Sequence, residues 1–256
     1  VNYGIYKNND NQGYLITVNN LLSKAIGQYL CFVDADDEIS RDKLSLQYNY
    51  IETYDVDICA TNTRLIDRDS RKILDIKYPS KQEGLSNSNR IKVTGSSIMF
   101  KRSVYDEIGG YDEHFNRIGA EDYDWILRAI SKGYSFFTLD KICYYYRKLD
   151  GSITNVWNFN ELNVKKLYSI ELSHLLHENK ISRDDQDIEA FFSSKADNYN
   201  DVVSKLAKQK INSNLVCKSN FLSLHRMIIK EVRKLELRFI LKSYAKFFYY
   251  RVSRYV

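Results

Sequence analysis

Two clusters of acidic side chains are the residues of this sequence that could carry out chemistry. The first, Asp34 to Asp37 (sequence DADD), directly follows a short apolar run over residues 28–33. The second, Glu121 and Asp122, opens a segment whose apolar spacing predicts a helix. Clustered carboxylates repel one another unless a cation holds them, and oxygen ligands suit Mg²⁺ or Mn²⁺. The first cluster therefore indicates a divalent-metal site, and the second offers a carboxylate that could act as a general base.

Each cluster also has a purely structural interpretation. Residues 34–37 could form an exposed acidic turn, and acids in a first helical turn are favoured by the helix dipole. In the functional interpretation, a cation at the first cluster would bridge the phosphates of a nucleotide and neutralise a departing diphosphate. Asp122 would then remove a proton from an acceptor hydroxyl. Neither cluster alone decides between the two interpretations.

The elements that must position these clusters alternate between helix and strand up to about residue 150. Apolar spacing predicts helices over 15–26, 40–54, 102–108 and 121–132, and strands over 28–33, 56–63, 92–100, 134–139 and 141–147. Residues 67–90 are polar and predict a loop or hairpin. The alternation favours an α/β fold with a mostly parallel sheet, in which ligands bind where strands end. From about residue 156 the pattern is helical, which divides the chain into a domain over 1–154 and a helical region over 155–256.

Composition bounds the class of protein. The chain has 256 residues, of which 44% are hydrophobic and 28% charged, enough to build a core in one or two domains. Mean hydropathy is −0.46, and no apolar run approaches the roughly 18 residues that cross a bilayer. Three of the four cysteines, Cys31, Cys59 and Cys143, lie in short apolar runs, as reduced buried thiols do, and Cys217 is far from them. We therefore expect a cytoplasmic protein.

The order of the motifs resembles glycosyltransferase family 2. A strand that ends in DADD is followed by GSSIMFKRSVYDEIGGYDEHF, then by GAEDYDWILRA and YYYRKLDGSIT, and the resemblance covers about residues 8–155. It implies a GT-A fold with a mostly parallel sheet flanked by helices. It also implies inverting transfer of a hexosyl or N-acetylhexosaminyl group from a nucleotide-diphospho-sugar, with a UDP-sugar expected, to a glycan or lipid-linked glycan. Mn²⁺ or Mg²⁺ would be the cofactor, and the product a bacterial capsule, O-antigen or exopolysaccharide.

The resemblance also assigns roles to residues. Asp122 and Glu121 match the family's catalytic pair, and Asp36 and Asp37 match its metal-binding positions. The donor side is implied at Asn11, Gly13, Asn19, Asp34, Thr94, Gly95 and Ser96, and the acceptor side at Gly110, Tyr111, Asp112 and Trp125. Val18, Leu21 and Leu149 stand where the family often has Arg, Gly and His. An Arg that helps to hold the nucleotide and a His that sometimes binds metal are thus absent at those positions.

The chain begins at Val1, near what would be the third strand of the family's fold. Family members normally open with a strand such as VSIIIPTYN and a later DDGS strand end, which hold the base and ribose. Neither motif occurs in this sequence. Because the loss of buried strands is large against a total stability of roughly 5–15 kcal/mol, we expect a partial or truncated catalytic domain, or an inactive remnant.

The basic character of the chain lies at its C-terminal end. Residues 225–256 carry nine Lys and Arg against two Glu, which exceeds the net charge of +5 of the whole chain. The cations recur mostly at intervals of three or four between apolar and aromatic residues, which predicts an amphipathic helix. This helix could dock on its own domain, or attach the protein to an anionic membrane surface on the cytoplasmic face of the inner membrane. Nucleic acid is not expected as a partner, because no recognisable binding module accompanies the helix.

Two other classes of function stay open at this point. A remnant could act only as a membrane-associated or partner-binding module. A nucleotidyltransferase of related α/β architecture would carry a glycine-rich phosphate loop near its N-terminus, and this sequence has none.

Overall fold

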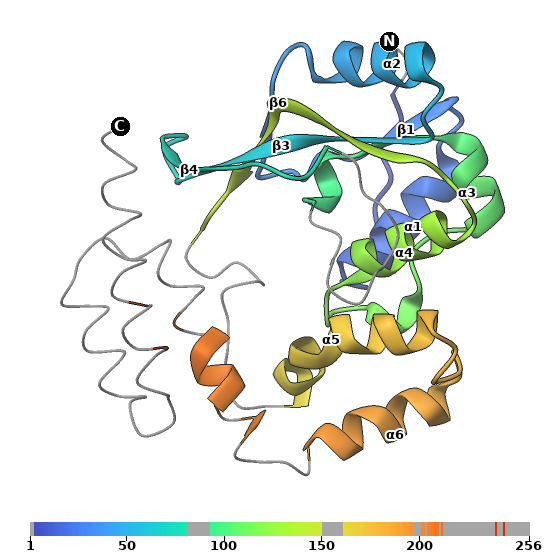
Figure 1. Ribbon diagram of the computed structural model, residues 1–256, viewed down its shortest axis with the longest axis vertical. Helices are drawn as coiled ribbons and strands as arrows, with labels where there is room; N and C mark the ends of the chain where they lie inside the picture. The colour runs from blue at the N-terminus through green and yellow to red at the C-terminus, as the bar shows by residue number, and fades with distance from the viewer. Residues whose placement is uncertain are drawn as a thin grey trace.

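The computed structural model describes residues 3–80, 93–149, 161–196, 201–202, 204–209, 211, 239 and 243. These residues form one sheet with helices on both faces (Figure 1). The helix α2 (Lys43–Tyr54) covers one face. The helices α1 (Tyr14–Lys24), α3 (Arg102–Ile108) and α4 (Glu121–Ser131) cover the other. The α/β class predicted from the sequence is therefore confirmed.

The described part of the sheet has six strands. They are β1 (Tyr29–Cys31), β2 (Glu38–Ile39), β3 (Ile58–Ile66), β4 (Lys72–Ile76), β5 (Met99–Lys101) and β6 (Phe136–Arg147). Their order is β1-β5-β3-β6-β2, and β4 pairs with the C-terminal half of β3. The long strands β3 and β6 form the centre, so the elements that precede and follow them meet at the ends of one ladder.

The prediction of a mostly parallel sheet is wrong for the described strands. Among the pairs of neighbouring strands, only β3–β6 is parallel, whereas the β1–β5, β3–β5, β3–β4 and β2–β6 pairs are antiparallel. The turn between β3 and β4, at residues 67–71, is too short for a crossover and must reverse the chain. β5 lies between β1 and β3 and runs opposite to both. Alternation along the sequence gave the class of fold, but it did not specify which strands are neighbours.

The core follows the period-two alternation of the strands. Ile58, Ala60 and Phe100 point towards α1, α3 and α4, while Cys59 and Met99 point towards Ile51 of α2. Tight packing against both faces leaves β3 almost wholly buried. This buried strand is the reason why loops at its two ends are held in fixed positions.

Two predicted strands differ from the structure. Residues 92–100 were expected to form one strand, but Gly95–Ser97 form a 3-10 turn, η1, and only the last part enters β5. The turn arises because Gly95 is buried against Asp122, where a strand could not pass. The separate strands expected over 134–139 and 141–147 are the single strand β6, whose register with β3 shifts near Asn62.

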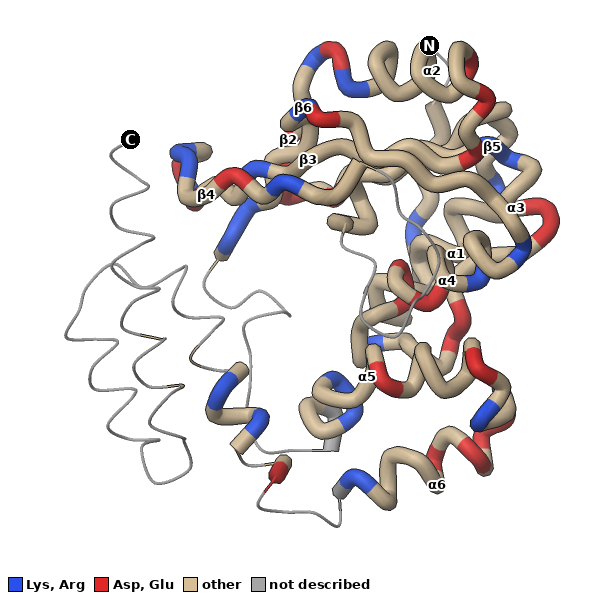
Figure 2. Tube along the Cα trace, viewed as in Figure 1, with Lys and Arg blue, Asp and Glu red and all other residues tan. Residues whose placement is uncertain are grey.

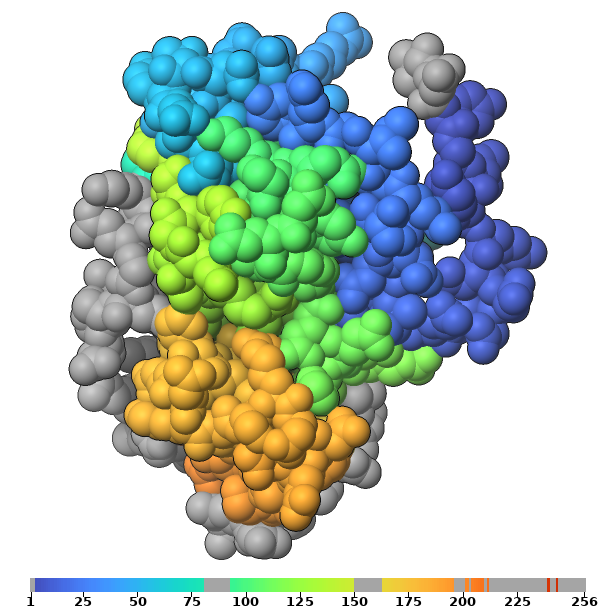
Figure 3. All heavy atoms as spheres, turned by 90° about the vertical axis from the view of Figure 1, so that its right-hand side faces the viewer, coloured from blue at the N-terminus to red at the C-terminus, as the bar shows by residue number. Residues whose placement is uncertain are grey.

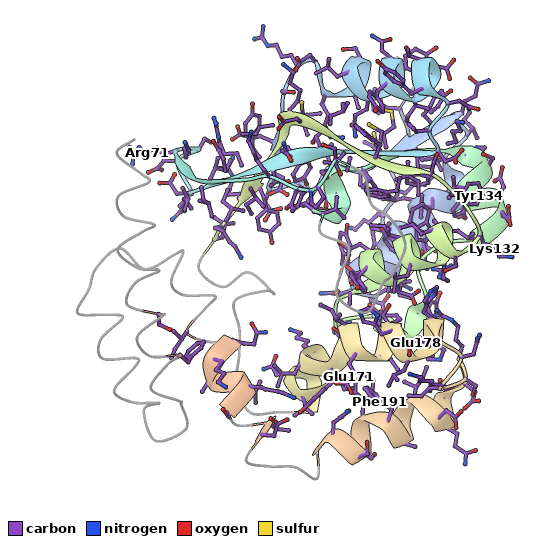
Figure 4. All side chains as sticks on the ribbon, viewed as in Figure 1. Arg71, Lys132, Tyr134, Glu171, Glu178 and Phe191 are labelled. Carbon is purple, nitrogen blue, oxygen red and sulfur yellow. The ribbon has the colours of Figure 1, made fainter. Side chains whose placement is uncertain are left out.

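The helical region after residue 155 is confirmed where the structure describes it. α5 (Glu161–His177) packs on α4, and α6 (Asp185–Ala196) packs on α5 (Figures 1 and 3). Glu171 and Phe191 lie between these two helices (Figure 4). Leu172 of α5 and Ile188 of α6 belong to the same apolar cluster as the residues of α1 and α4. The core thus continues across residue 154, and the division into two domains there stays a prediction.

The basic helix predicted over 225–256 lies outside the described residues, apart from Phe239 and Ser243. None of the helices in the described ranges combines the length and apolarity that a bilayer crossing requires. The membrane-surface prediction is therefore untested.

Substituting Ile58 in the central strand should destabilise the protein strongly. Ile58 is 0% exposed, so Ile58→Ala removes buried methylenes and leaves a cavity, which lowers the free energy of unfolding by about 2–5 kcal/mol. Ile26→Ala is the matched control, because Ile26 is 95% exposed and should change stability by less than about 0.5 kcal/mol. Urea unfolding of the two variants measures both values, and equal losses would contradict the burial of β3.

Candidate active site

The structure brings the two acidic clusters predicted from the sequence into one place. Asp34 follows β1, and Glu121 and Asp122 form the first turn of α4. The Asp34 carboxylate lies close enough to contribute to raising the pKa of both Glu121 and Asp122. The site is therefore built from the end of an edge strand, the start of α4 and the turn η1, which contacts both.

Asp122 is fixed by backbone donors. The Tyr123 N–H donates to its Oδ1 at 2.7 Å, and the Gly95 N–H also donates to this carboxylate. A Cβ at position 95 would lie 2.3 Å from Oδ2 of Asp122, so only glycine lets η1 approach this closely. Burial raises the pKa of Asp122, and the negative charge of Asp34 raises it further.

Glu121 is the second carboxylate of the pair. Burial is the largest cause that raises its pKa, followed by the charge of Asp122, and together they bring it to about 7. A carboxylate with a pKa near neutrality can accept and release a proton under physiological conditions. The geometry therefore makes both Glu121 and Asp122 candidates for a general base.

Hydroxyl groups surround Asp34. Ser96 Oγ donates to Asp34 Oδ2 at 2.7 Å, and the Tyr14 and Tyr144 hydroxyls each share a hydrogen bond with Ser96. The Tyr14 ring is 41% exposed, but its hydroxyl lies inward at Ser96. Burial raises the pKa of both tyrosines, and the nearby carboxylates raise it further, so both stay protonated. They can thus act as neutral hydrogen-bond donors beside the carboxylates.

Asp37 fastens the acidic turn to β6. The Tyr144 hydroxyl donates to its Oδ2 at 2.6 Å, and the Arg147 N–H donates to its Oδ1 at 2.7 Å. The Arg147 side chain donates to the Asp36 carbonyl at 2.7 Å and to the Asp67 carbonyl at 3.0 Å. One arginine therefore joins the acidic turn, the β3–β4 turn and β6, and this fixes the position of residues 34–37.

The described carboxylates do not form a complete metal cage. No group of three or more His, Cys, Asp or Glu side chains is arranged to hold an ion among the residues that the structure describes. Asp37 already accepts one hydrogen bond on each oxygen, whereas the exposed Asp36 carboxylate makes no hydrogen bond or ion pair to another described residue. Mg²⁺ sites on phosphates commonly use only one or two carboxylates, with the substrate supplying further oxygens. The exposed Asp36 carboxylate and the Oδ1 atom of Asp34, which accepts no hydrogen bond from another described residue, are oxygens of the kind that such an ion uses.

The site carries net negative charge. Within the described ranges, none of the ion pairs joins a Lys or Arg side chain to Asp34, Asp36, Asp37, Glu121 or Asp122. Asp112 and Asp124, only a few residues away along the chain, do have such partners. Among the described residues, these five carboxylates are therefore not neutralised by an ion pair with a Lys or Arg side chain.

Comparison with known proteins then decides the family. A family model described as "Glycosyltransferase like family 2" matches residues 1–187. The chain belongs to this family. An uncharacterized glycosyltransferase of Methanocaldococcus jannaschii is 27% identical over 168 residues, which cover 64% of this chain and 55% of that protein. The O-antigen biosynthesis glycosyltransferase WbnJ of Escherichia coli is 28% identical over 123 residues, covering 45% of this chain and 44% of that protein. The chain spans about half the length of these curated relatives.

Solved structures show weaker likenesses. S. aureus TarS 1–349 in complex with UDP-GlcNAc has a TM-score of 0.48 and 17% identity, over 87% of this chain and 69% of that one. The mannosyltransferase PcManGT of Pyrobaculum calidifontis, in complex with GDP-Man and Mn²⁺, has a TM-score of 0.45 and 11% identity, over 96% and 67%. Both scores are too low to place a ligand on this member of glycosyltransferase family 2.

Two residues predicted on the donor side, Asn11 and Asn19, make hydrogen bonds within the protein. The Asn19 amide donates to the Tyr111 carbonyl and accepts from the Tyr111 N–H, both at 2.8 Å, so Asn19 anchors the turn before η2 (Glu113–Phe115). Asn11 Oδ1 accepts from the Gly13 N–H at 3.1 Å and shapes the entry to α1. Asn19 is thus held on both sides of its amide by Tyr111, whereas Asn11 is exposed and makes its hydrogen bond within its own turn.

The predicted sugar-pocket residues Thr94, Gly95 and Ser96 do lie at the site. Gly95 and Ser96 contact Asp122 and Asp34, as described above. The Thr94 hydroxyl bonds to Thr63 at 3.0 Å and to the Tyr78 hydroxyl at 2.7 Å, so it is linked to β3 and to the chain that follows β4. The structure thus brings this part of the prediction together with the acidic pair.

The predicted acceptor side is mostly buried. Trp125 is 1% exposed, stacks near Phe100 and donates from Nε1 to the Gly109 carbonyl at 2.9 Å. This placement gives Trp125 a core role and contradicts direct contact with an acceptor. Gly110 lies against Asn19, where a Cβ would be 2.5 Å from its Oδ1. Tyr111 is buried near Tyr14 and Asp122, and Asp112 contacts His114 and Arg183.

Three site residues were missed by the sequence analysis: Tyr14, Tyr144 and Arg147. The chain has 21 tyrosines, so residue type gave no signal for the first two. Arg147 lies in the YYYRKLDGSIT motif, where its position after three β-strand tyrosines could have indicated an anchoring role.

Glu121 should make the stability of the protein depend on pH. Its pKa is raised from 4.5 to about 7 in the folded state, so its contribution to stability is fully present below pH 4.5 and is lost as pH rises through about 7. Glu121→Gln removes this loss. Between pH 5 and pH 8, the unfolding free energy of the wild type should therefore decrease by about 1–3 kcal/mol more than that of the variant.

Chemical denaturation at a series of pH values measures this difference. Glu113→Gln is the control, because Glu113 is exposed on η2 and should leave the pH profile of the wild type unchanged. Parallel profiles for wild type and Glu121→Gln would contradict the raised pKa.

Proposed function

We propose that this chain is catalytic machinery of an inverting glycosyltransferase, which moves a sugar from a nucleotide-diphosphate donor to an acceptor hydroxyl. The observation that carries the proposal is that η1 joins the two acidic clusters: Ser96 donates to Asp34, and the neighbouring Gly95 lies against Asp122 at the start of α4. Membership of glycosyltransferase family 2 supports the reaction class. The transferred group is a hexosyl or N-acetylhexosaminyl residue.

Asp122 is the proposed general base. Two backbone N–H groups hold its carboxylate in one orientation, and burial with neighbouring charge makes it more basic than an ordinary aspartate. It accepts the proton of the acceptor hydroxyl while that oxygen forms a bond to the anomeric carbon. The bond from the anomeric carbon to the nucleotide diphosphate breaks, and the diphosphate leaves with the electron pair. Glu121 lies beside Asp122, and because its pKa is about 7 it can take up a proton and so reduce the negative charge next to the base.

Asp36 and Asp34 are the proposed ligands of Mn²⁺ or Mg²⁺. A bound divalent cation supplies charge neutralisation for the leaving diphosphate. The protein's own contribution is to fix the turn, through Asp37, Tyr144 and Arg147, so that the two carboxylates are presented without a competing cation. We assign Asp37 to this anchoring role because both of its oxygens already accept hydrogen bonds.

A UDP-sugar as donor and a glycan or lipid-linked glycan as acceptor suit this site. The E. coli relative is named for O-antigen biosynthesis, which supports a role in bacterial cell-surface polysaccharide. Nucleotide-sugars would be met in the cytoplasm, and the basic residues 225–256 would let the protein attach to the cytoplasmic face of the inner membrane.

Replacing the proposed base should abolish transfer without removing donor binding. Asp122→Asn keeps the size and acceptor oxygen of the side chain, so kcat should fall by about 10²–10⁴-fold. The assay is release of UDP from UDP-sugars in the presence of Mn²⁺ and a glycan acceptor, with donor affinity measured by calorimetry. Asp106→Asn is the control, since Asp106 is exposed on α3 and away from the site. Full transfer by Asp122→Asn would remove this mechanism.

Replacing the proposed metal ligand should act on binding first. Asp36→Asn removes the exposed carboxylate, so Mn²⁺-dependent binding of UDP should weaken by about tenfold or more. Asp69→Asn is the control, because Asp69 lies on the exposed β3–β4 turn and its replacement should not change UDP binding. Calorimetric titration of UDP with and without Mn²⁺ measures both. Metal-independent binding, or no UDP binding at all by the wild-type chain, would instead favour a partner-binding remnant.

A further inference from the structure

A single arginine connects the C-terminal helices to the helix that carries the acidic pair. Arg183 lies in the loop between α5 and α6, and Figure 2 shows charges of both signs on this loop. Its guanidinium pairs with Asp112 through Nη1 and with Asp124 through Nη2, the latter at 2.7 Å. Asp112 is the N-cap of η2, and Asp124 is the fourth residue of α4. Arg183 therefore joins three segments that are distant in sequence.

The ion pairs continue into the turn before η2. Asp124 is 1% exposed and also accepts from Arg128 at 2.9 Å. Arg128 in turn donates to the carbonyls of Ile108 at 2.6 Å and Gly110 at 2.7 Å. We call the set Asp112, Asp124, Arg128 and Arg183 the α4 clamp. It ties one side of α4 to the turn over 108–112 and to the α5–α6 loop.

The start of α4 needs such support. Ala120, the residue before Glu121, has φ +70°, a left-handed conformation that is unfavourable for a residue with a Cβ. Strained conformations of this kind persist only where the surrounding structure holds them. The Asp124 N–H donates to the Ala120 carbonyl at 2.9 Å, so Asp124 belongs to the same helical turn that presents Glu121 and Asp122.

We propose that Arg183 is a positioning residue for the acidic pair, acting through Asp124 and Asp112. The guanidinium can bridge two carboxylates because its donors form a rigid fork, which a lysine ammonium cannot reproduce. Without Arg183, the buried Asp124 keeps Arg128 as its cation, and Asp112 keeps its contacts with His114. The direct link from the α5–α6 loop to α4 is lost, and the first turn of α4 can relax. A displacement of about 1 Å at a catalytic group can lower turnover by roughly 100-fold. The α5–α6 hairpin, packed under α4 in Figure 3, is then part of the catalytic unit.

The kinetic test rests on the proposed function. Arg183→Met should lower kcat for sugar transfer by about 10–100-fold and change the KM for the nucleotide-sugar by less than about twofold. Arg183→Lys keeps the charge but not the fork, and should recover only part of kcat. Lys195→Met is the matched control, because Lys195 pairs with Glu171 inside the same hairpin and does not touch α4. Its kcat should equal that of the wild type, and an equal fall in both variants would overturn the proposal.

A second readout does not depend on sugar transfer. Amide hydrogen exchange at residues 120–125 should be faster in Arg183→Met than in the wild type, and unchanged in Lys195→Met. If the wild type transfers no sugar from any UDP-sugar, the proposed function fails, and hydrogen exchange alone decides on the clamp. Unchanged exchange at residues 120–125 in Arg183→Met would overturn the positioning role. If Arg183→Met does not fold, Arg183→Lys takes its place: its kcat should fall less than about tenfold and its exchange at residues 120–125 should still be faster than in the wild type, and wild-type values of both would overturn the proposal.

Discussion

The mutual repulsion of carboxylates gathered at one place is the constraint on which the rest of this structure depends. Asp34, Glu121 and Asp122 come from two elements far apart in sequence, and burial strengthens their repulsion because fewer water molecules screen it. A fold that holds them together must supply stability from elsewhere. The stability that offsets this repulsion comes from a sheet whose central strand β3 is almost wholly buried. It also comes from polar contacts that fix each acidic segment separately.

The cations of the protein are distributed in a way that fits this constraint. Arg147 directs its side chain to backbone carbonyls and to Glu38, and Arg128 and Arg183 direct theirs to Asp124 and Asp112. Lys43, the fully buried first residue of α2, lies near three thiols, and burial lowers its pKa. Arginines thus orient the segments that carry the site, while the described partners of the site's own carboxylates are hydroxyl and backbone N–H groups. Such a site can attract a cation, whereas a site already paired with lysine or arginine could not.

Sequence reasoning predicted the parts of this arrangement that depend on local pattern. The helices, the strand before DADD and the acids at the start of α4 follow from apolar spacing and from the position of glycines, and the joint order of motifs indicated the family. The sequence pattern could not show that the two Asp37 oxygens accept hydrogen bonds from Tyr144 and Arg147, or that Trp125 faces the core. Those outcomes depend on which strands are neighbours, and the one parallel and four antiparallel pairings were not encoded in the alternation of elements.

The α4 clamp shows why a boundary drawn from the pattern of predicted helices and strands need not be a boundary of function. The change from alternating elements to helices near residue 155 is real in the sequence, yet the apolar core and the Arg183 ion pairs both cross it. The family match also extends to residue 187 and so includes Arg183. An isolated segment over 1–154 would leave Asp124 with one cation instead of two, and would expose the side of α4 that packs on α5. Because α4 begins at a strained alanine, this loss would act directly on the turn that presents Glu121 and Asp122. The helical hairpin therefore completes the site that the α/β part begins.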